Sequence, residues 1–358
     1  EPLFRQIGIY SHSGQKYDPV DSDQFLYYRE ASDGQILEEG ISEAGAMSSF
    51  IAAGTSYANH SQQMIPFFIY YSMFGFQRIG DFIWAAADMR TKGFLIGGTA
   101  GRTTLNGEGL QHQDGHSHLI ASTIPNLKAY DPAYAYEIAI IIQDGLDKMY
   151  NKNEDIFYYL TLENENYVQP KMPENVQEGI IKGMYQIKKS KKTELKVQLL
   201  ASGPILNEVL ASSKLLLEDW GIESDVWSVT SYSELHKDAE DVNRWNLLNP
   251  DKPNRVSYLD ECLNKSEGPI IACSDYVKLV SEQISPYIDC ELTSIGTDGF
   301  GRSGSRSELR DFFEIDKFYI TLAAINSLYK QNKIDKKIIE KVIKTYNIDS
   351  NKLNPLKC

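Results

Sequence analysis

The stretch "NGEGLQHQDGHSH", residues 106–118, holds three of the six histidines of the chain together with two acids and three glycines. The imidazoles of His112, His116 and His118 could bind one zinc ion. The glycines favour a loop, however, whereas histidines four residues apart usually chelate a metal from a helix. Two further interpretations stay open. In one, the polar side chains satisfy each other and cap neighbouring helices. In the other, Glu108 and His112 act as acid–base groups, since histidine titrates near neutral pH.

Glu43 is a second candidate, because it lies in the otherwise small and apolar segment "EEGISEAGAM". It is either an exposed carboxylate on a helix or one in an apolar pocket, where loss of water favours the protonated form. A carboxylate of the second kind can exchange a proton with a bound heterocycle. The segment "IYYSMFGFQR" then carries the aromatic residues Tyr70, Tyr71, Phe74 and Phe76. Their spacing favours a core, although a ligand platform remains open.

The glycine-rich segment "GTDGFGRS", residues 296–303, resembles a loop that binds phosphate through its backbone. It lacks the Gly-Lys-Ser/Thr of a P-loop and the Gly-x-Gly-x-x-Gly of a dinucleotide site. We therefore treat it as a weak signal without an assigned role.

An alternation of helices and strands positions these residues. Apolar residues three and four apart predict a helix within 34–60. The continuous apolar run 64–74 is typical of a strand buried on both faces, and 94–99 and 156–162 predict two more buried strands. Helical segments separate these strands, which indicates a parallel sheet with its ligand site at the carboxyl ends of the strands.

A second α/β pattern follows, with strands in "KVQLLASG", "SDVWSVTS" and "GPIIACSD". Its first long helix has Pro204 near the start and Gly221 just past the end, the usual asymmetry. Between the two patterns lies a stretch with two prolines and little apolar content. We predict a first domain over 1–165, a linker over 166–178 and a second domain over 179–358.

Charge and composition exclude several classes of protein. The net charge of -13 argues against binding to nucleic acid or to an anionic membrane surface. No apolar run is long enough to span a membrane. The four cysteines form no Cys-x-x-Cys pair, which favours reduced thiols in the cytoplasm. The chain starts "EPLFRQIGIY", without Met or a signal peptide, so we expect a piece of a longer protein.

Several motifs together resemble one enzyme family. "GQILEEGISEAGA", "IPFFIYYSMFGFQRIGD", "GFLIGGTAGRTTLNGEGLQHQDGHSH" and "GTDGFGRSGSRSELRDFFEID" are similar to the homodimeric bacterial pyruvate dehydrogenases, the thiamine-diphosphate component of the pyruvate dehydrogenase complex. The resemblance runs from residue 1 to about 355. It implies an α/β fold of two transketolase-like domains: a parallel-sheet pyrimidine-binding domain, truncated at its start, and a mixed-sheet carboxy-terminal domain.

The resemblance also implies roles for single residues and favours the pocket interpretation of Glu43. In the family, the carboxylate at this position bonds a ring nitrogen of the aminopyrimidine and promotes loss of the thiazolium proton. Arg78 is expected to serve the site at longer range. The cofactor-binding residues implied are Glu43, Ile41, Phe74 and Tyr71, and the catalytic residues implied are Glu43, Tyr71, Glu108 and His112, with Tyr71 and His112 at the pyruvate carboxylate.

The implied cofactors are thiamine diphosphate and magnesium. The sequence has no Gly-Asp-Gly motif, so we expect no metal ligands here and place them on a missing amino-terminal half. Implied partners are a second copy in a homodimer, that missing half and the lipoyl-bearing acyltransferase of the complex. The implied activity is that of a pyruvate dehydrogenase (acetyl-transferring). A non-catalytic assembly module remains the alternative, and a transketolase-like or branched-chain 2-oxoacid enzyme is a third possibility.

Overall fold

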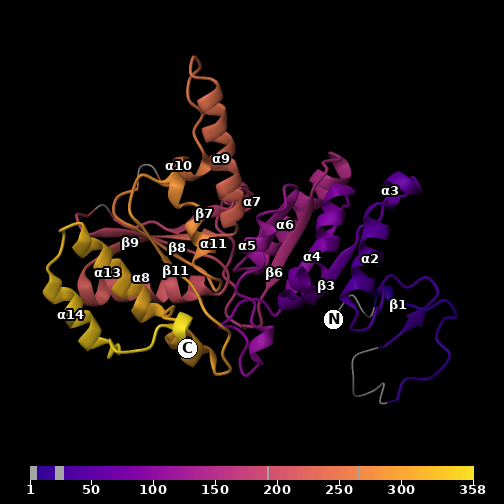
Figure 1. Cartoon of the computed structure of the whole chain (residues 1–358), viewed down its shortest axis with the longest axis horizontal. Coiled ribbons are helices and arrows are strands. Elements are labelled where there is room, and N and C mark those ends of the chain that lie inside the picture. Colours follow the sequence, from indigo (N-terminus) through magenta and orange to yellow (C-terminus); the bar gives the residue numbers. More distant parts are fainter. Residues whose placement is uncertain (1–5, 21–27, 192, 264–265) are drawn as a thin grey trace.

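The computed structural model describes residues 6–20, 28–191, 193–263 and 266–358. Two α/β units lie side by side along the long axis of the molecule (Figure 1). Ahead of them, two short parallel strands pair near the start of the chain, β1 (Ile9–Tyr10) and β2 (Glu30–Ala31). None of the described helices is long and apolar enough to cross a membrane.

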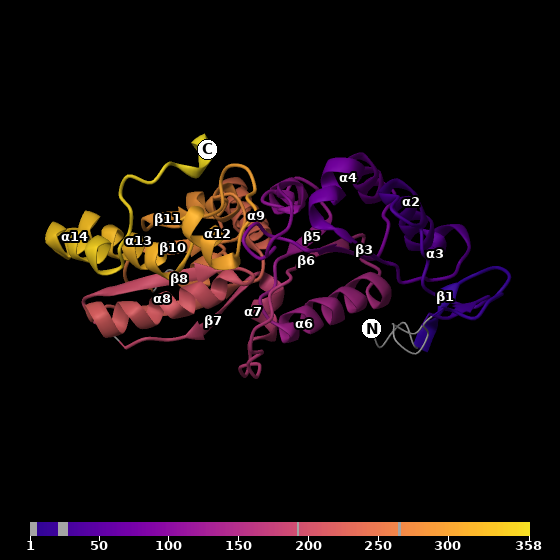
Figure 2. The ribbon, with the colours of Figure 1, turned by 90° about the horizontal axis from the view of Figure 1, so that it is seen from below.

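The first unit is built on a four-stranded parallel sheet in the order β3-β4-β6-β5. Helices α4 and α6 cover its opposite faces (Figure 2). The central strands are accordingly buried on both faces, and every apolar residue from Phe157 to Leu160 is fully buried. The elements of this unit are β3 (Phe67–Tyr71), β4 (Phe94–Gly98), β5 (Leu127–Tyr130), β6 (Phe157–Leu162), α2 (Glu43–Gly54), α3 (Ser56–Asn59), α4 (Ser72–Asp88), η1 (Leu110–His112), α5 (Ser117–Ala121), α6 (Ala135–Leu146) and η2 (Asp147–Asn151).

The second unit has a five-stranded mixed sheet in the order β11-β10-β8-β9-β7, in which β7 runs antiparallel to β9. Helix α8 begins directly after Pro204 and ends at Gly221, whose φ of 67° lets the chain turn. The elements are α7 (Gln177–Lys182), β7 (Met184–Lys188), β8 (Lys196–Ala201), α8 (Ile205–Trp220), β9 (Glu223–Val229), α9 (Tyr232–Leu248), α10 (Tyr258–Leu263), β10 (Ile270–Cys273), α11 (Leu279–Glu282), η3 (Ser285–Tyr287), β11 (Leu292–Ile295), α12 (Arg306–Phe312), α13 (Lys317–Lys330), α14 (Lys336–Thr345) and η4 (Pro355–Lys357).

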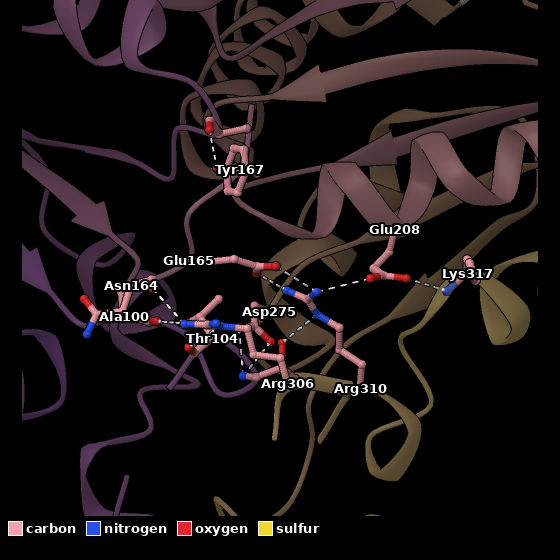
Figure 3. A network of polar contacts seen from close by, with 12 residues as sticks. Ala100, Thr104, Asn164, Glu165, Tyr167, Glu208, Asp275, Arg306, Arg310 and Lys317 are labelled. Atoms are coloured by element: carbon pink, nitrogen blue, oxygen red, sulfur yellow. Dashed lines mark hydrogen bonds and ion pairs between the residues drawn. The ribbon is translucent and has the colours of Figure 1, made fainter. Parts of the chain in front are cut away.

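Buried polar contacts join the two units. Arg310 on α12 bonds Glu165, which follows the first sheet, and it also bonds Glu208 of its own unit, on α8, at 3.1 Å (Figure 3). Glu137 on α6 is fully buried and accepts hydrogen bonds from Tyr185 and Ser228 of the second sheet, both at 2.7 Å. The side chains in these contacts are largely buried, so removing one partner leaves a buried polar group without a hydrogen bond.

The α/β class, the parallel first sheet and the mixed second sheet are confirmed. The division between the two sheets falls after β6 and before β7, and the exact boundaries predicted for the domains and the linker stay predictions.

Two predicted elements differ from the structure. The helix expected within 34–60 begins only at Glu43, because Gly40 has a φ of 66° and the Ser42 hydroxyl caps the helix by accepting a bond from the Gly45 N–H at 3.3 Å. Ile36 and Ile41 therefore precede the helix.

The run 64–74 is likewise not one buried strand. Strand β3 lies at the edge of its sheet and exposes Phe67, Ile69 and Tyr71, by 47%, 72% and 53%. The chain then enters α4 directly at Ser72, so Phe74 lies on a helix and not on the strand. A continuous apolar run does not distinguish a central strand from an edge strand that joins a helix without a loop.

Candidate active site

Three aromatic rings meet at the carboxyl ends of β3 and β4. Tyr71 is the last residue of β3, and Phe74 lies in the first turn of α4. His112 reaches the same place from the segment that follows β4. Its ring lies 5.5 Å from that of Tyr71 and 5.2 Å from that of Phe74, and the Tyr71 and Phe74 rings are 6.2 Å apart. All three pairs meet edge to face, which is a favourable aromatic geometry.

Glu43 joins this group through Arg78. Its carboxylate accepts a hydrogen bond from the Arg78 guanidinium at 2.7 Å. The guanidinium carbon lies 4.2 Å from the centre of the Phe74 ring, within the range of a cation–π contact. Phe74 and Arg78 are four residues apart on α4 and so share one face of the helix. Arg78 thus touches both residues directly, and its expected role at longer range from the site stays a prediction.

The environment of Glu43 matches neither of the two interpretations of the sequence. The carboxylate lies at the first position of α2, and its side chain is 19% exposed. It is thus neither free in water nor held in an apolar pocket. It is a partly buried carboxylate paired with a cation, and only one of its two oxygens has a polar partner among the described residues. The other oxygen can accept a hydrogen bond or a proton from a ligand.

Glu108 and His112 are associated loosely. The Glu108 carboxylate lies 3.9 Å from the Nδ1 atom of His112, beyond hydrogen-bond distance. That nitrogen is buried and has no hydrogen-bond partner among the described residues. His112 belongs to the short 3-10 helix η1 and not to an irregular loop. A shift of about 1 Å in the Glu108 side chain would complete the bond and fix the tautomer of the imidazole.

The remaining histidines of the stretch have separate partners. The Nε2 atom of His116 is 2.6 Å from the Gln77 amide. His118 is buried, and its Nε2 atom is 2.8 Å from the Thr161 hydroxyl. Burial lowers the pKa of His118, which keeps the imidazole neutral at neutral pH. Across the described ranges, no three His, Cys, Asp or Glu side chains lie close enough together to hold a metal ion.

Ile41 is not part of this contact group in the structure. It lies two residues before α2 and is 97% exposed. Its predicted place in the wall of a cofactor pocket stays a prediction, as do the roles predicted for Glu43, Tyr71, Phe74, Glu108 and His112.

The group fits the aminopyrimidine half of thiamine diphosphate in its chemistry. A flat, polar heterocycle needs an aromatic or apolar face and a carboxylate at a ring nitrogen. Tyr71 supplies exposed and Phe74 half-buried aromatic surface, and Glu43 supplies a carboxylate oxygen that has no polar partner among the described residues. The described residues offer no cluster of three His, Cys, Asp or Glu side chains for a metal ion.

Comparison with known proteins gives two matches to protein families. The model of the pyruvate dehydrogenase E1 component middle domain matches residues 1–170. The model of the transketolase-like TK C-terminal domain matches residues 183–316.

Solved transketolases share the fold. Transketolase from Campylobacter jejuni subsp. jejuni NCTC 11168 aligns with a TM-score of 0.61 at 20% identity, over 84% of this chain and 40% of that chain. A split gene transketolase, described as an inactive beta4 tetramer, aligns with a TM-score of 0.60 at 15% identity, over 91% of this chain and 93% of that chain. The fold is therefore transketolase-like.

Curated relatives define the family more closely. The pyruvate dehydrogenase E1 component of Pseudomonas aeruginosa is 59% identical over 360 residues, which cover 100% of this chain and 41% of that protein. The pyruvate dehydrogenase E1 component of Escherichia coli (strain K12) is 54% identical over 357 residues, 99% of this chain and 40% of that protein. The chain is thus homologous over its whole length to pyruvate dehydrogenase E1 components, and it spans about two fifths of the length of these relatives.

Proposed function

We propose that the chain is part of a pyruvate dehydrogenase (acetyl-transferring) that decarboxylates pyruvate on thiamine diphosphate and reductively acetylates the lipoyl group of an acyltransferase component. The observation that carries the proposal is the contact of Glu43, through Arg78 and Phe74, with His112 at the carboxyl ends of two parallel strands. Ligands of open parallel sheets bind at such an edge.

Each residue has a distinct task in this proposal. Bound thiamine diphosphate supplies a carbon centre that stabilises the negative charge left by decarboxylation. The Glu43 carboxylate holds a proton at a ring nitrogen of the pyrimidine, while Phe74 and Ile41 pack against the ring. Tyr71 and His112 contact the carboxylate of pyruvate, and Glu108 orients the His112 imidazole.

The site is completed by other parts of the enzyme. We place the magnesium and diphosphate ligands on the portion of the enzyme that corresponds to the remaining three fifths of the relatives' length. The working form is proposed to be a cytoplasmic homodimer, because a site shared between subunits requires both copies. The lipoyl group must reach the site from solvent, and the 53% exposure of Tyr71 is consistent with an open approach.

Reconstitution tests the proposal. The chain is mixed with the amino-terminal portion of the same enzyme, thiamine diphosphate and magnesium, and pyruvate-dependent acetylation of a lipoyl domain is measured. Glu43→Gln should slow exchange of the thiazolium C2 proton by about 10²–10⁴-fold, the usual contribution of one acid–base group. Folding should persist, because glutamine keeps the shape of the Glu43 side chain and the Arg78 guanidinium, which is 49% exposed, stays in contact with water. Glu38→Gln, which changes an exposed carboxylate of the same segment, is the control.

The outcomes separate the candidate functions. A stable complex that binds thiamine diphosphate but does not turn over pyruvate would favour the assembly-module alternative. Turnover of sugar phosphates or branched 2-oxoacids in preference to pyruvate would favour the third possibility. Equal C2 exchange in Glu43→Gln and the unmodified enzyme would refute the role of Glu43.

A further inference from the structure

The glycine-rich loop at residues 296–303 follows β11, at the carboxyl end of the second sheet. It packs against the segment 106–113 of the first unit, which we call the substrate loop. The Gln113 side-chain amide donates to the Arg302 carbonyl at 2.5 Å and accepts from the Arg302 N–H at 2.6 Å. The Arg102 guanidinium donates to the carbonyls of Thr297 and Gly299.

The contact points lie on either side of Glu108 and His112, the two titratable residues of the substrate loop. The Gly107 N–H, next to Glu108, donates to the Gly304 carbonyl at 3.0 Å. Gln113, next to His112, is 1% exposed. The residues between these anchors are exposed from 106 to 111. Contacts with the second unit, together with the ring contacts of His112, therefore fix where Glu108 and His112 lie.

The fit between the two loops leaves no room for a side chain. A Cβ atom at Gly301 would lie 2.7 Å from both the Gln113 side-chain oxygen and the Leu110 carbonyl oxygen. Contacts this short force one of the two loops to move. Glycine at position 301 thus serves close approach of the loops.

The same contacts argue against phosphate binding by the glycine-rich loop. The N–H of Arg302 is already bonded to Gln113, and the carbonyls of Thr297 and Gly299 accept from Arg102. Carbonyl oxygens repel an anion, whereas phosphate loops present free N–H groups.

We propose that the glycine-rich loop of the second unit positions the substrate loop, with Gln113 and Arg102 as positioning residues for Glu108 and His112. The inference rests on the proposed function for its catalytic consequence, although the loop contacts stand without it. It gives the second unit a task in the reaction of the first: it sets the distance of the His112 imidazole from Tyr71 and Phe74, now 5.5 and 5.2 Å between ring centres.

Two substitutions break the contact from opposite sides. Gly301→Ala pushes the loops apart sterically, and Gln113→Ala removes both side-chain hydrogen bonds. Loss of two partly buried hydrogen bonds should speed amide hydrogen exchange across 106–112 by about tenfold. Ser303→Ala is the control, because Ser303 is exposed and its hydroxyl makes no hydrogen bond among the described residues.

The test uses the reconstituted enzyme and three readouts: amide exchange of 106–112, C2-proton exchange of thiamine diphosphate, and kcat/KM for pyruvate. Both variants should show faster amide exchange and a kcat/KM lower by about tenfold. C2-proton exchange should be unchanged, because Glu43 is held by Arg78 of α4 and not by the substrate loop. A general structural defect would instead lower C2-proton exchange as well.

Each other result overturns one part of the reasoning. Amide exchange equal to that of Ser303→Ala would show that the glycine-rich loop does not hold the substrate loop. Faster amide exchange with an unchanged kcat/KM would show that the position of the loop does not matter for the reaction. An unmodified enzyme that does not turn over pyruvate would refute the proposed function, while amide exchange would still decide the structural claim. If Gly301→Ala does not fold, Gln113→Ala decides alone.

Discussion

Arg310 provides a direct measure of what one cluster of buried ion pairs contributes to stability. Its side chain is 8% exposed and pairs with Glu165 and Glu208, which are 17% and 19% exposed (Figure 3). Arg310→Met keeps much of the side-chain volume but leaves two largely buried carboxylates without their cation. Removal of one partner of a buried ion pair costs about 3–5 kcal/mol.

Urea unfolding of the chain measures this cost, and a matched control is available on α13. Lys330→Met removes an ion pair with Glu291 in which the two side chains are 54% and 33% exposed. Such a pair contributes about 0–1 kcal/mol, because water screens it. The difference between the two variants should therefore exceed about 2 kcal/mol in the free energy of unfolding.

A second substitution tests the cause of the effect. Adding Glu165→Gln to Arg310→Met replaces one stranded carboxylate by a neutral amide and should recover part of the loss. The reasoning is refuted if Arg310→Met costs no more than Lys330→Met, or if Glu165→Gln brings no recovery in the double variant.

Two further predictions concern burial. Burial raises the pKa of Asp275 to about 7, although the Thr103 N–H and Arg310 counteract it. A carboxyl group in the unfolded chain ionises at about pH 4, so the unfolded state releases its proton first as the pH rises. The free energy of unfolding should therefore fall between about pH 4 and about pH 7, by up to about 1.4 kcal/mol per pH unit. Asp275→Asn should flatten this slope in urea titrations, and an unchanged slope would assign the pH dependence to other groups. Gly97→Ala places a Cβ atom 2.6 Å from the Tyr159 hydroxyl, and it should lower the stability measured by thermal unfolding by about 1–3 kcal/mol. Unchanged stability would show that β4 can shift to make room for the methyl group.

Local signals in the sequence were sufficient to predict the elements whose ends are marked by particular residues or whose apolar run has the length of a strand. Pro204 and Gly221 enclose α8 as predicted, and the apolar runs of β4 and β6 became central strands. Strand β3 has the same apolar character but lies at the edge. Its place depends on which strands pair with it, and composition does not carry that information.

The contacts of the candidate site depend on pairs that are distant in the sequence. Glu43 and Arg78 are 35 residues apart, and Gln113 and Arg302 are 189 residues apart. The resemblance to a family identified Glu43 and His112 but assigned no partner to Gln113. The only local signal for the second pair was the density of glycines around Gly301, and that signal was first interpreted as a possible phosphate site.

The exposed edge of the first sheet affects how the chain behaves when it is handled alone. An edge strand presents unpaired backbone groups, and β3 adds the apolar side chains of Phe67, Ile69 and Tyr71 to them. Such a strand is a template for non-native β-sheet pairing between molecules. We therefore expect the isolated chain to aggregate as its concentration rises. Light scattering should detect this aggregation, and Ile69→Lys should suppress it.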